Sequence, residues 1–343
     1  MRIAIVGATG LVGRTMLALL AERPWAEDPP RLLATERSAG SVLSFRGRDV
    51  VVEDVKAFDP HDVDLALFSA GASVSRDLAP LFTAAGAWVV DNSSAWRMDR
   101  GTALIVPEIN GGSLPDHPSI VANPNCSTIQ IVMAVAPLHD VFGLRQLHVA
   151  TYQSVSGAGA GARVALLEQL DARRPLDADG ILGPAEGGPF ARSVAFDAVP
   201  EIGPPQEDGS FEEEAKVERE SRKILGLPRL HVTCLAVRVP SWNGHGAVVR
   251  AVFAHDVDRK VAIDRLQAFP GVTAAAMAHD YRTPNEVTGQ DRVHVGRLRV
   301  DPGDSKALTL WVAADNLLKG AALNALQIAD LIASRRSFSG GDR

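Results

Sequence analysis

The chain has 343 residues, of which 46% are hydrophobic and 22% are charged, and its formal net charge is −6. This composition is typical of a soluble globular enzyme, the length predicts two domains, and the negative charge argues against a nucleic-acid partner. Because there are only two cysteines, Cys126 and Cys234, a disulfide framework is excluded and a reducing compartment is favoured. The sequence shows no export signal and no apolar run approaching the ~20 residues that span a bilayer. We therefore expect a cytoplasmic protein with no membrane partner and no metal site.

The first part of the chain alternates short apolar runs with segments of helical periodicity. The predicted strands are residues 3–6, 32–34, 65–68 and 88–90, and the predicted helices are residues 11–20 and 74–85. The strands are apolar throughout, which is typical of strands buried on both faces. This alternation predicts a Rossmann-like, doubly wound parallel sheet.

The sequence changes character after about residue 150. Segments rich in β-forming residues predict strands over 231–239, 247–253, 292–300 and 307–313. In the third of these segments the alternation slips at Gly296, which indicates a β-bulge. We expect an α+β domain with a largely antiparallel or mixed sheet. A surface loop over 173–189 and an apolar helix over 317–332 complete this part of the prediction.

Three glycines, Gly7, Gly10 and Gly13, lie between the first predicted strand and the first predicted helix. Glycines at this place let the backbone approach a pyrophosphate closely, and the start of a helix offers free N–H groups. The loop therefore predicts a dinucleotide site. A tight structural turn is the alternative.

The end of the second predicted strand bears on which dinucleotide is bound. Arg37 and Ser38 could hold the 2′-phosphate of NADP, whereas Glu36 could bind the ribose of NAD. We favour NADP, and NAD stays open.

Cys126 lies directly before an apolar helical stretch, residues 129–138, and has the polar neighbours Asn125 and Ser127. A helix start stabilises a thiolate and makes a cysteine reactive. The alternative is a buried structural cysteine, which is the reading that fits Cys234 in its apolar strand. A nucleophilic cysteine in a dinucleotide-binding protein indicates attack on an acyl group, a thioester, and hydride transfer that yields an aldehyde.

Ten characteristic segments occur in order along nearly the whole chain. They are GATGLVG at Gly7, ERSAG at Glu36, FSAG at Phe68, DNSSAWRM at Asp91, VPEIN at Val106, ANPNCSTIQ at Ala122, TYQSVSGAG at Thr151, EEEAKVERESRKIL at Glu212, RVPSWNGH at Arg238 and DNLLKGAALNALQIAD at Asp315. With these segments the chain resembles aspartate-semialdehyde dehydrogenase of the bacterial type.

The resemblance implies a catalytic role for three positions. Cys126 matches the nucleophile, and His245 matches the acid/base histidine. Gln153 matches the glutamine that orients the substrate.

Five further positions match substrate-binding residues of that family. Arg97 and Lys216 match the cationic pair that binds phosphate, and Asn125 matches an amide that contacts phosphate. Glu213 matches the carboxylate that receives the substrate ammonium, and Arg238 matches the arginine that pairs with the substrate carboxylate. Taken alone, Glu213 and Lys216 would be a solvated ion pair on a predicted helix.

The resemblance also implies which residues contact the cofactor. These are Gly7, Thr9, Gly10, Leu11, Val12 and Gly13 in the glycine loop, Arg37 and Ser38, Ser69 and Ala70, and Ser156, Gly157 and Asn316 on the nicotinamide side. Two places depart from the pattern of the family. Gly246-Ala247 replaces the Ser-Glu that often follows the histidine, which leaves open what supports His245. Leu11 replaces a frequent alanine, a change that affects helix packing.

The expected activity is the NADP-dependent reduction of L-4-aspartyl phosphate to L-aspartate 4-semialdehyde, a step towards lysine, threonine and methionine. Residues 1–125 with 315–343 are expected to form the dinucleotide-binding domain, and residues 126–314 the catalytic and dimerisation domain. By the resemblance the protein forms a homodimer, or a tetramer. Two alternatives stay open: a sister reductase such as N-acetyl-glutamyl-phosphate reductase, and an inactive relative that acts as a binding protein.

Overall fold

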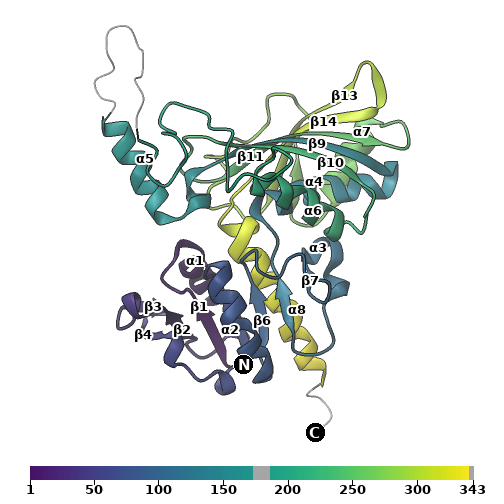
Figure 1. The fold of residues 1–343 in the computed structure, drawn as a ribbon. Coiled ribbons are helices and arrows are strands. Elements are labelled where there is room, and N and C mark those ends of the chain that lie inside the picture. Colours follow the sequence, from purple (N-terminus) through teal and green to yellow (C-terminus); the bar gives the residue numbers. More distant parts are fainter. Residues whose placement is uncertain (173–185, 340–343) are drawn as a thin grey trace. The chain divides into compact units, whose positions relative to one another are not determined.

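The computed structural model describes residues 1–172 and 186–339 and divides the chain into two compact units, each with its own sheet (Figure 1). The first unit comprises Met1–Asn125 and Gly320–Arg343, and the second comprises Cys126–Lys319. Apart from residues 186–189, the predicted loop over 173–189 lies outside the described residues. Within the described ranges, no helix combines the length and the apolar character needed to cross a membrane.

The first unit is built on an eight-stranded sheet in which all neighbours are parallel except β3 and β4. In spatial order the strands are β3 (Val42–Phe45), β4 (Arg48–Asp54), β2 (Arg31–Ala34), β1 (Ile3–Val6), β5 (Leu65–Phe68), β6 (Trp88–Asp91), β8 (Ile120–Ala122) and β7 (Ala103–Leu104). The chain passes from β1 to β2 on one side and later to β5 on the other, so β1 marks the switch point at which ligands bind in such sheets. The predicted doubly wound sheet is confirmed.

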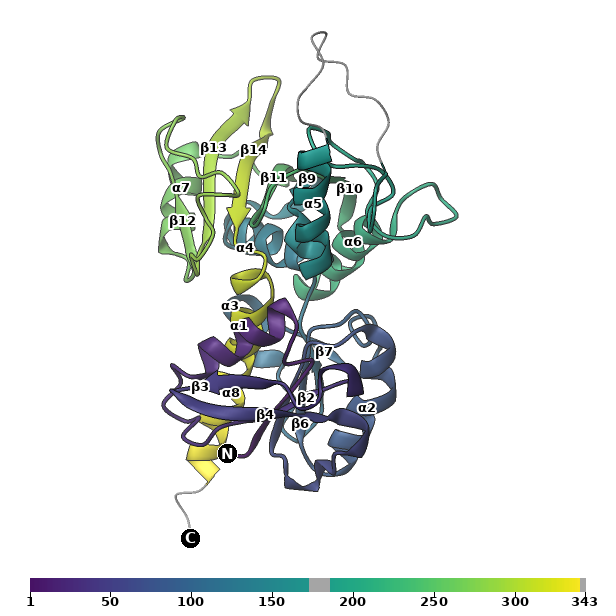
Figure 2. The same ribbon diagram turned by 90° about the vertical axis from the view of Figure 1, so that its left-hand side faces the viewer.

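The central strand β1 is buried on both faces. The helices of this unit are α1 (Leu11–Leu20), α2 (Ala72–Ala84), α3 (Pro107–Asn110) and α8 (Leu323–Ser339). Ile3 and Ile5 pack in one apolar cluster with α1 and α8, whereas Ala4 and Val6 pack in a second cluster with α2. Figure 2 shows α1 and α8 on one side of the sheet and α2 on the other. Because alternate residues of a strand point to opposite faces, a strand covered on both faces has to be apolar throughout.

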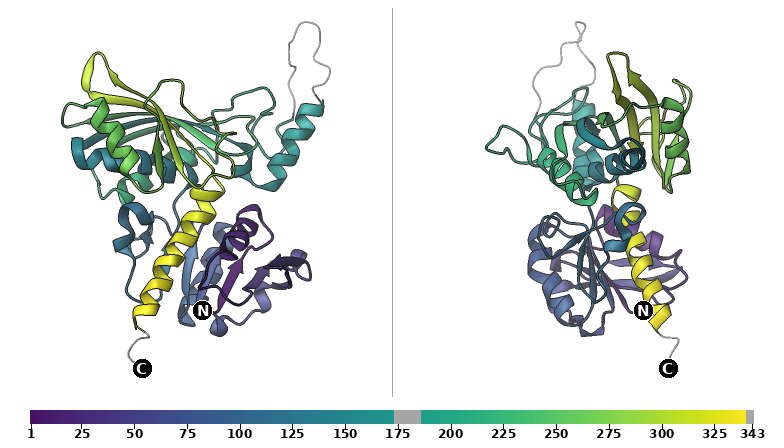
Figure 3. Two further views of the ribbon diagram at one scale, coloured as in Figure 1. Left: turned by 180° about the vertical axis from the view of Figure 1, so that it is seen from behind. Right: turned by 90° about the vertical axis from the view of Figure 1, so that its right-hand side faces the viewer.

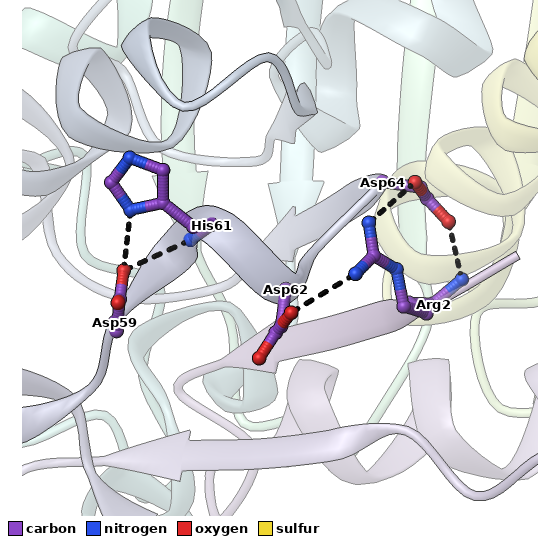
Figure 4. A network of polar contacts seen from close by, with 5 residues as sticks. All are labelled: Arg2, Asp59, His61, Asp62 and Asp64. Carbon is purple, nitrogen blue, oxygen red and sulfur yellow. Dashed lines mark hydrogen bonds and ion pairs between the residues drawn. The ribbon is translucent and has the colours of Figure 1, made fainter.

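A network of charged residues joins the beginnings of β1 and β5 (Figure 4). The backbone N–H of Arg2 donates to Asp64 Oδ2 over 2.7 Å, and its guanidinium contacts Asp62 Oδ1 at 3.1 Å and Asp64 Oδ1 at 3.3 Å. Nearby, Asp59 Oδ1 accepts from the backbone N–H of His61 over 3.1 Å. Exposed ion pairs of this kind contribute little to stability, so the pairing of β1 with β5 depends on the buried apolar residues.

The second unit contains a mixed six-stranded sheet. In spatial order the strands are β10 (His231–Arg238), β9 (Leu144–Gln153), β11 (His245–Phe253), β14 (Asp304–Ala314), β13 (Val293–Asp301) and β12 (Val272–Ala274). The two outer pairs, β10–β9 and β12–β13, are parallel, and the inner pairs are antiparallel. The predicted mixed sheet is confirmed. The predicted bulge is also confirmed, because the pairing of β13 with β14 shifts after Gly296.

Helices cover one face of this sheet. The helices of the second unit are α4 (Cys126–Phe142), α5 (Ala160–Ala172), α6 (Glu212–Ile224) and α7 (Arg259–Ala268). Helix α4 contacts β9, β11 and β14, α6 contacts β10, and α7 contacts β12 and β13. In the left panel of Figure 3 the teal helix α4 and the green helix α7 lie below the strands. On the opposite face Tyr152, Leu235 and Val248 are exposed by 37%, 53% and 36%.

Two differences from the prediction in the second half bear on the site. Strand β9 was not predicted. It lies between β10 and β11, and these three strands carry the polar residues described below. The predicted helix over 317–332 begins instead with a π-helical turn, Leu318–Ala322, before α8. The Asp315 carboxylate accepts from the backbone N–H groups of Leu317 and Leu318 and so holds the entry to this turn.

Candidate active site

Three polar side chains lie in a row at the ends of three neighbouring strands. Arg238 ends β10, Gln153 ends β9 and His245 begins β11, and Gln153 is the direct partner of both others in the strand register. Directly paired residues point to the same face of a sheet. All three are buried, with exposed fractions of 6%, 2% and 0%. Buried polar groups are costly unless they are bonded, so this row marks a specialised site.

Gln153 is bonded to Glu213 at the start of α6. Its Nε2 donates to Glu213 Oε1 over 3.1 Å, and its Oε1 accepts from Thr151 Oγ1 over 3.0 Å. Lys216 Nζ lies 3.6 Å from Glu213 Oε2 and 3.2 Å from Glu212 Oε1. The predicted pair of Glu213 and Lys216 therefore forms, but Glu213 is 7% exposed. This carboxylate belongs to the buried site and not to a solvated helix face.

His245 is held by the residue that follows Gln153. The backbone N–H of Ser154 donates to His245 Nδ1 over 3.1 Å, and Arg238 Nη1 donates to the Ser154 carbonyl over 2.6 Å. A Cβ atom on Gly157 would lie 3.2 Å from both Arg238 Nη1 and His245 Nε2, so a larger residue at this position would crowd both side chains. Burial, followed by the positive charge of Arg238, lowers the pKa of His245 to about 3, although the Gly244 backbone and then Glu213 act in the opposite direction. The imidazole is therefore neutral at neutral pH.

The two cysteines lie in different settings. Cys126 is half-buried at the first residue of α4, where the helix dipole favours a negative charge. Burial lowers the pKa of Arg238, whereas the negative charges of Glu213 and Cys126 raise it, so Cys126 lies within electrostatic reach of Arg238. Burial and the charge of Glu214 raise the pKa of Cys234 in β10. Cys234 is thus an unreactive thiol.

A group of polar residues behind His245 was not predicted from the sequence. Ser156 Oγ donates to Asn243 Oδ1 over 2.9 Å and lies 3.1 Å from Asn316 Oδ1, and Asn243 Nδ2 donates to Asp315 Oδ2 over 3.0 Å. Ser154 Oγ lies 2.9 Å from Ser156 Oγ. The side chains of Ser156 and Asn316, which we expected on the nicotinamide side, are thus bonded within this network. The closely spaced serines in the SVSG segment are the signal that could have identified it.

The departure at Gly246 has a steric cause. A Cβ atom on Gly246 would lie 2.3 Å from the ring of Trp311, and the Trp311 indole is fixed because its Nε1 donates to the Arg282 carbonyl over 2.7 Å. Ala247, the next residue, is fully buried. The Ser-Glu pair of the family pattern would not fit here.

In the first unit, the glycine loop is closely packed. Gly7 has a φ of 83°, and a Cβ atom on it would lie 2.6 Å from the Ser69 carbonyl oxygen. A Cβ atom on Gly13 would lie 2.2 Å from the Gly7 carbonyl oxygen. Gly10 precedes α1 without a side-chain cap, which leaves the first N–H groups of the helix available to an anion. The loop therefore fits a pyrophosphate. Half-buried residues around it are Thr9, Leu11, Val12, Ser69 and Ala70.

Beside β2, the residues Glu36–Ser38 form a 3-10 turn directly after the strand. Glu36 and Arg37 are both exposed and Ser38 is half-buried. Both charges stay available to a ribose or a 2′-phosphate.

The first unit also contains two predicted phosphate contacts. Arg97 is 7% exposed, and its Nη2 donates to the Asn92 carbonyl over 2.9 Å. Asn125 is 6% exposed and directly precedes Cys126. The other predicted catalytic and substrate-binding residues, Cys126, Gln153, Glu213, Lys216, Arg238 and His245, belong to the second unit.

Two family models match most of the chain. Residues 2–117 match the semialdehyde dehydrogenase NAD binding domain, and residues 135–319 match the semialdehyde dehydrogenase dimerisation domain. The aspartate-semialdehyde dehydrogenase of Corynebacterium glutamicum is 43% identical, over 96% of this chain and 98% of its own length. This chain belongs to the aspartate-semialdehyde dehydrogenase family.

Other members of the aspartate-semialdehyde dehydrogenase family are similar along their whole length. The Bacillus subtilis enzyme is 40% identical over 96% of both chains. The crystal structure of aspartate semialdehyde dehydrogenase II from Vibrio cholerae, complexed with ASA, has a TM-score of 0.91 and 39% identity over 97% of this chain and 98% of that chain. The fold described above is therefore that of the family.

Proposed function

We propose that this chain catalyses the NADPH-dependent reduction of L-4-aspartyl phosphate to L-aspartate 4-semialdehyde and phosphate, through a thioester on Cys126. The proposal is supported by the names of relatives at about 40% identity over nearly full length. The observation that carries it is the buried row of Arg238, Gln153 and His245, with the Glu213 carboxylate bonded to Gln153.

Covalent chemistry is assigned to Cys126. Its thiolate attacks the acyl carbon, and the bond from that carbon to the phosphate oxygen breaks, so phosphate leaves with the electron pair. Bound NADPH supplies the hydride that reduces the thioester. His245 faces the oxygen that becomes negative, and collapse of the tetrahedral species expels the Cys126 thiolate and releases the aldehyde.

Substrate recognition is assigned to the charged groups of the site. Arg238 donates one of its five N–H groups to the Ser154 carbonyl, and we assign other N–H groups of its guanidinium to the substrate α-carboxylate. Glu213 receives the ammonium. Lys216 and Arg97, with Asn125, bind the phosphate.

The glycine loop and the turn after β2 are assigned to NADP. The close packing at Gly7 and Gly13 requires glycine, and the uncapped first N–H groups of α1 bind the pyrophosphate. Arg37 and Ser38 hold the 2′-phosphate, and Glu36 is the competing group that would favour NAD.

The exposed face of the second sheet is assigned to a second copy of the chain. Tyr152, Leu235 and Val248 are apolar and exposed on it, and the family model that matches this region is a dimerisation domain. We propose a homodimer.

One assay tests the substrate, the cofactor and the phosphate site. Aspartate semialdehyde is oxidised with and without inorganic phosphate, using NADP or NAD, and the absorbance of the reduced nicotinamide is followed. We expect phosphate-dependent formation of NADPH that exceeds formation of NADH. Activity confined to N-acetyl-glutamate semialdehyde would instead identify the sister reductase, since an acylated substrate has no ammonium for Glu213. No turnover with either substrate would identify an inactive relative.

A further inference from the structure

The position of the proton on His245 follows from one hydrogen bond. The Ser154 backbone N–H can only donate, and it points at His245 Nδ1 over 3.1 Å. Nδ1 must therefore present a lone pair. In a neutral imidazole only one ring nitrogen carries hydrogen, so the proton lies on Nε2.

Nε2 itself faces the site. His245 is fully buried, and Nε2 has no hydrogen-bond partner within the part of the chain that the structure describes. It lies beside Gly157, where a Cβ atom would come within 3.2 Å. A buried N–H group without a partner is costly, so this donor is arranged for an oxygen that arrives with the substrate.

A chain of hydrogen bonds holds Ser154 in place. Its Oγ lies 3.1 Å from His245 Nδ1 and 2.9 Å from Ser156 Oγ, which donates to Asn243 Oδ1. Asn243 Nδ2 donates to Asp315 Oδ2, and an ionised carboxylate only accepts, so the Asn243 amide has one orientation. Asp315 is fixed in turn by the backbone N–H of Gly289 at 2.8 Å.

We propose that Ser154 and Asn243 are positioning residues that keep the proton of His245 on Nε2, so that His245 acts as a neutral hydrogen-bond donor to the thiohemiacetal oxygen. The inference rests on the proposed function. Hydride addition to the thioester carbon moves the C=O π pair onto oxygen, and the Nε2–H group stabilises that charge. The pair then re-forms C=O while the C–S bond breaks and the Cys126 thiolate leaves. No proton passes to or from His245 in this sequence, so the charges balance without an imidazolium.

The charged groups around His245 support a neutral ring. Arg238 from β10 contributes a positive charge, Glu213 from α6 a negative one, and Asp315 is separated from the ring by Asn243 and the two serines. Burial is the largest effect and lowers the pKa of His245 to about 3. A neutral imidazole that donates through Nε2 is an established way to polarise a substrate oxygen.

Nitrogen NMR of the full chain, labelled with ¹⁵N-histidine, tests the tautomer without any turnover. The signal of His245 is assigned by its loss in His245→Ala. We expect a protonated Nε2 and an unprotonated Nδ1, unchanged between pH 8 and pH 5. A proton on Nδ1, or a doubly protonated ring in this range, would overturn the inference. Since the spectrum does not depend on activity, an Nε2–H signal in a protein without turnover would count against the proposed function alone.

Kinetics test the positioning role. Ser154→Ala keeps the backbone N–H and removes only the Oγ contacts, including those to His245 and Ser156. We expect it and Asn243→Ala to lower kcat about 10- to 100-fold, the range found for partners that orient metal-binding histidines, with KM little changed. In a His245→Ala background neither substitution should lower kcat further, because the group through which they act is gone. An equal loss in both backgrounds would show a general structural role and overturn the assignment. Ser193→Ala is the matched control, since Ser193 is a buried serine of the same unit that bonds to Gln169 instead.

Discussion

Gln153 Nε2 lies 3.1 Å from Glu213 Oε1, and this bond joins the end of β9 to the first turn of α6. Because a carboxylate oxygen accepts, the Gln153 NH2 group faces Glu213 and its Oε1 faces the Thr151 hydroxyl, so the amide has a single orientation. The Glu213 carboxylate is thereby held in a buried place, with its other oxygen 3.6 Å from Lys216 Nζ. This relationship gives the first prediction.

Replacing Glu213 with glutamine should weaken recognition of the substrate ammonium. We expect Glu213→Gln to raise KM for aspartate semialdehyde about 10-fold or more, since a charge-assisted hydrogen bond contributes about 1.5–3 kcal/mol. The effect on kcat should be smaller. Steady-state kinetics with varied semialdehyde measure both values. An unchanged KM would remove Glu213 from the ammonium site.

The two cysteines provide a matched pair of variants. Cys126→Ala should lower kcat about a thousandfold or more, because no thioester can form. Cys234→Ala should leave kcat almost unchanged, since burial raises the pKa of that thiol and makes it unreactive. Equal losses in the two variants would contradict the assignment of the nucleophile. Iodoacetamide labelling followed by mass spectrometry should modify Cys126 first.

The glycine loop can be tested by adding one methyl group. In Gly13→Ala the new Cβ would lie 2.2 Å from the Gly7 carbonyl oxygen, so the loop has to shift. We expect a loss of about 1–3 kcal/mol in the free energy of unfolding, as for other overpacked sites, together with weaker NADPH binding. Gly112→Ala is the control, because a Cβ atom there would meet no other atom within 4 Å. Urea unfolding and NADPH fluorescence titration measure the two effects.

The cofactor preference depends on the turn after β2. Arg37→Ala should raise KM for NADPH about 10-fold, through loss of a charge-assisted bond to the 2′-phosphate, and leave KM for NADH almost unchanged. Glu36→Ala, the neighbouring exposed residue, should not weaken NADPH binding. If Glu36→Ala selectively weakened NADH instead and Arg37→Ala had no effect, NAD would be the preferred cofactor.

His245 makes stability depend on pH. Its pKa falls from an ordinary 6.5 to about 3 in the folded chain. The contribution to stability is therefore complete above the unfolded pKa and is lost as the pH falls towards the folded pKa. Between pH 7 and pH 5 the wild-type protein should lose about 2 kcal/mol more of its free energy of unfolding than His245→Gln, which does not titrate. Urea titrations at the two pH values test this, and parallel losses would mean that the pKa of His245 is not lowered in the folded chain.

The sequence predicted the first sheet well because its strands are buried on both faces. An uninterrupted apolar run such as Ile3–Val6 is typical of a strand that is buried on both faces. The glycines that follow it mark the start of α1. The edge hairpin was missed because β3 has only four residues and β4 begins and ends with charged residues and buries only one.

The candidate site was less accessible to sequence reasoning. Local patterns favoured Cys126 at a helix start, but strand β9 was missed because it ends in the buried polar residues Thr151 and Gln153. Pairing between segments far apart in sequence brings Arg238 and His245 to Gln153, and no local pattern encodes that register. The support of His245 by Ser154 through a backbone N–H depends on geometry alone.

The row of Arg238, Gln153 and His245 also limits where the chain can change in length. A single residue inserted within β9 would turn Gln153 to the opposite face of the sheet, while Arg238 and His245 would stay on the original face. Insertions before Leu144, before His231 or after Phe253 fall at the far ends of the same strands and leave the row intact. Comparison of natural homologues should therefore find gaps at those far ends and none between them and the polar row.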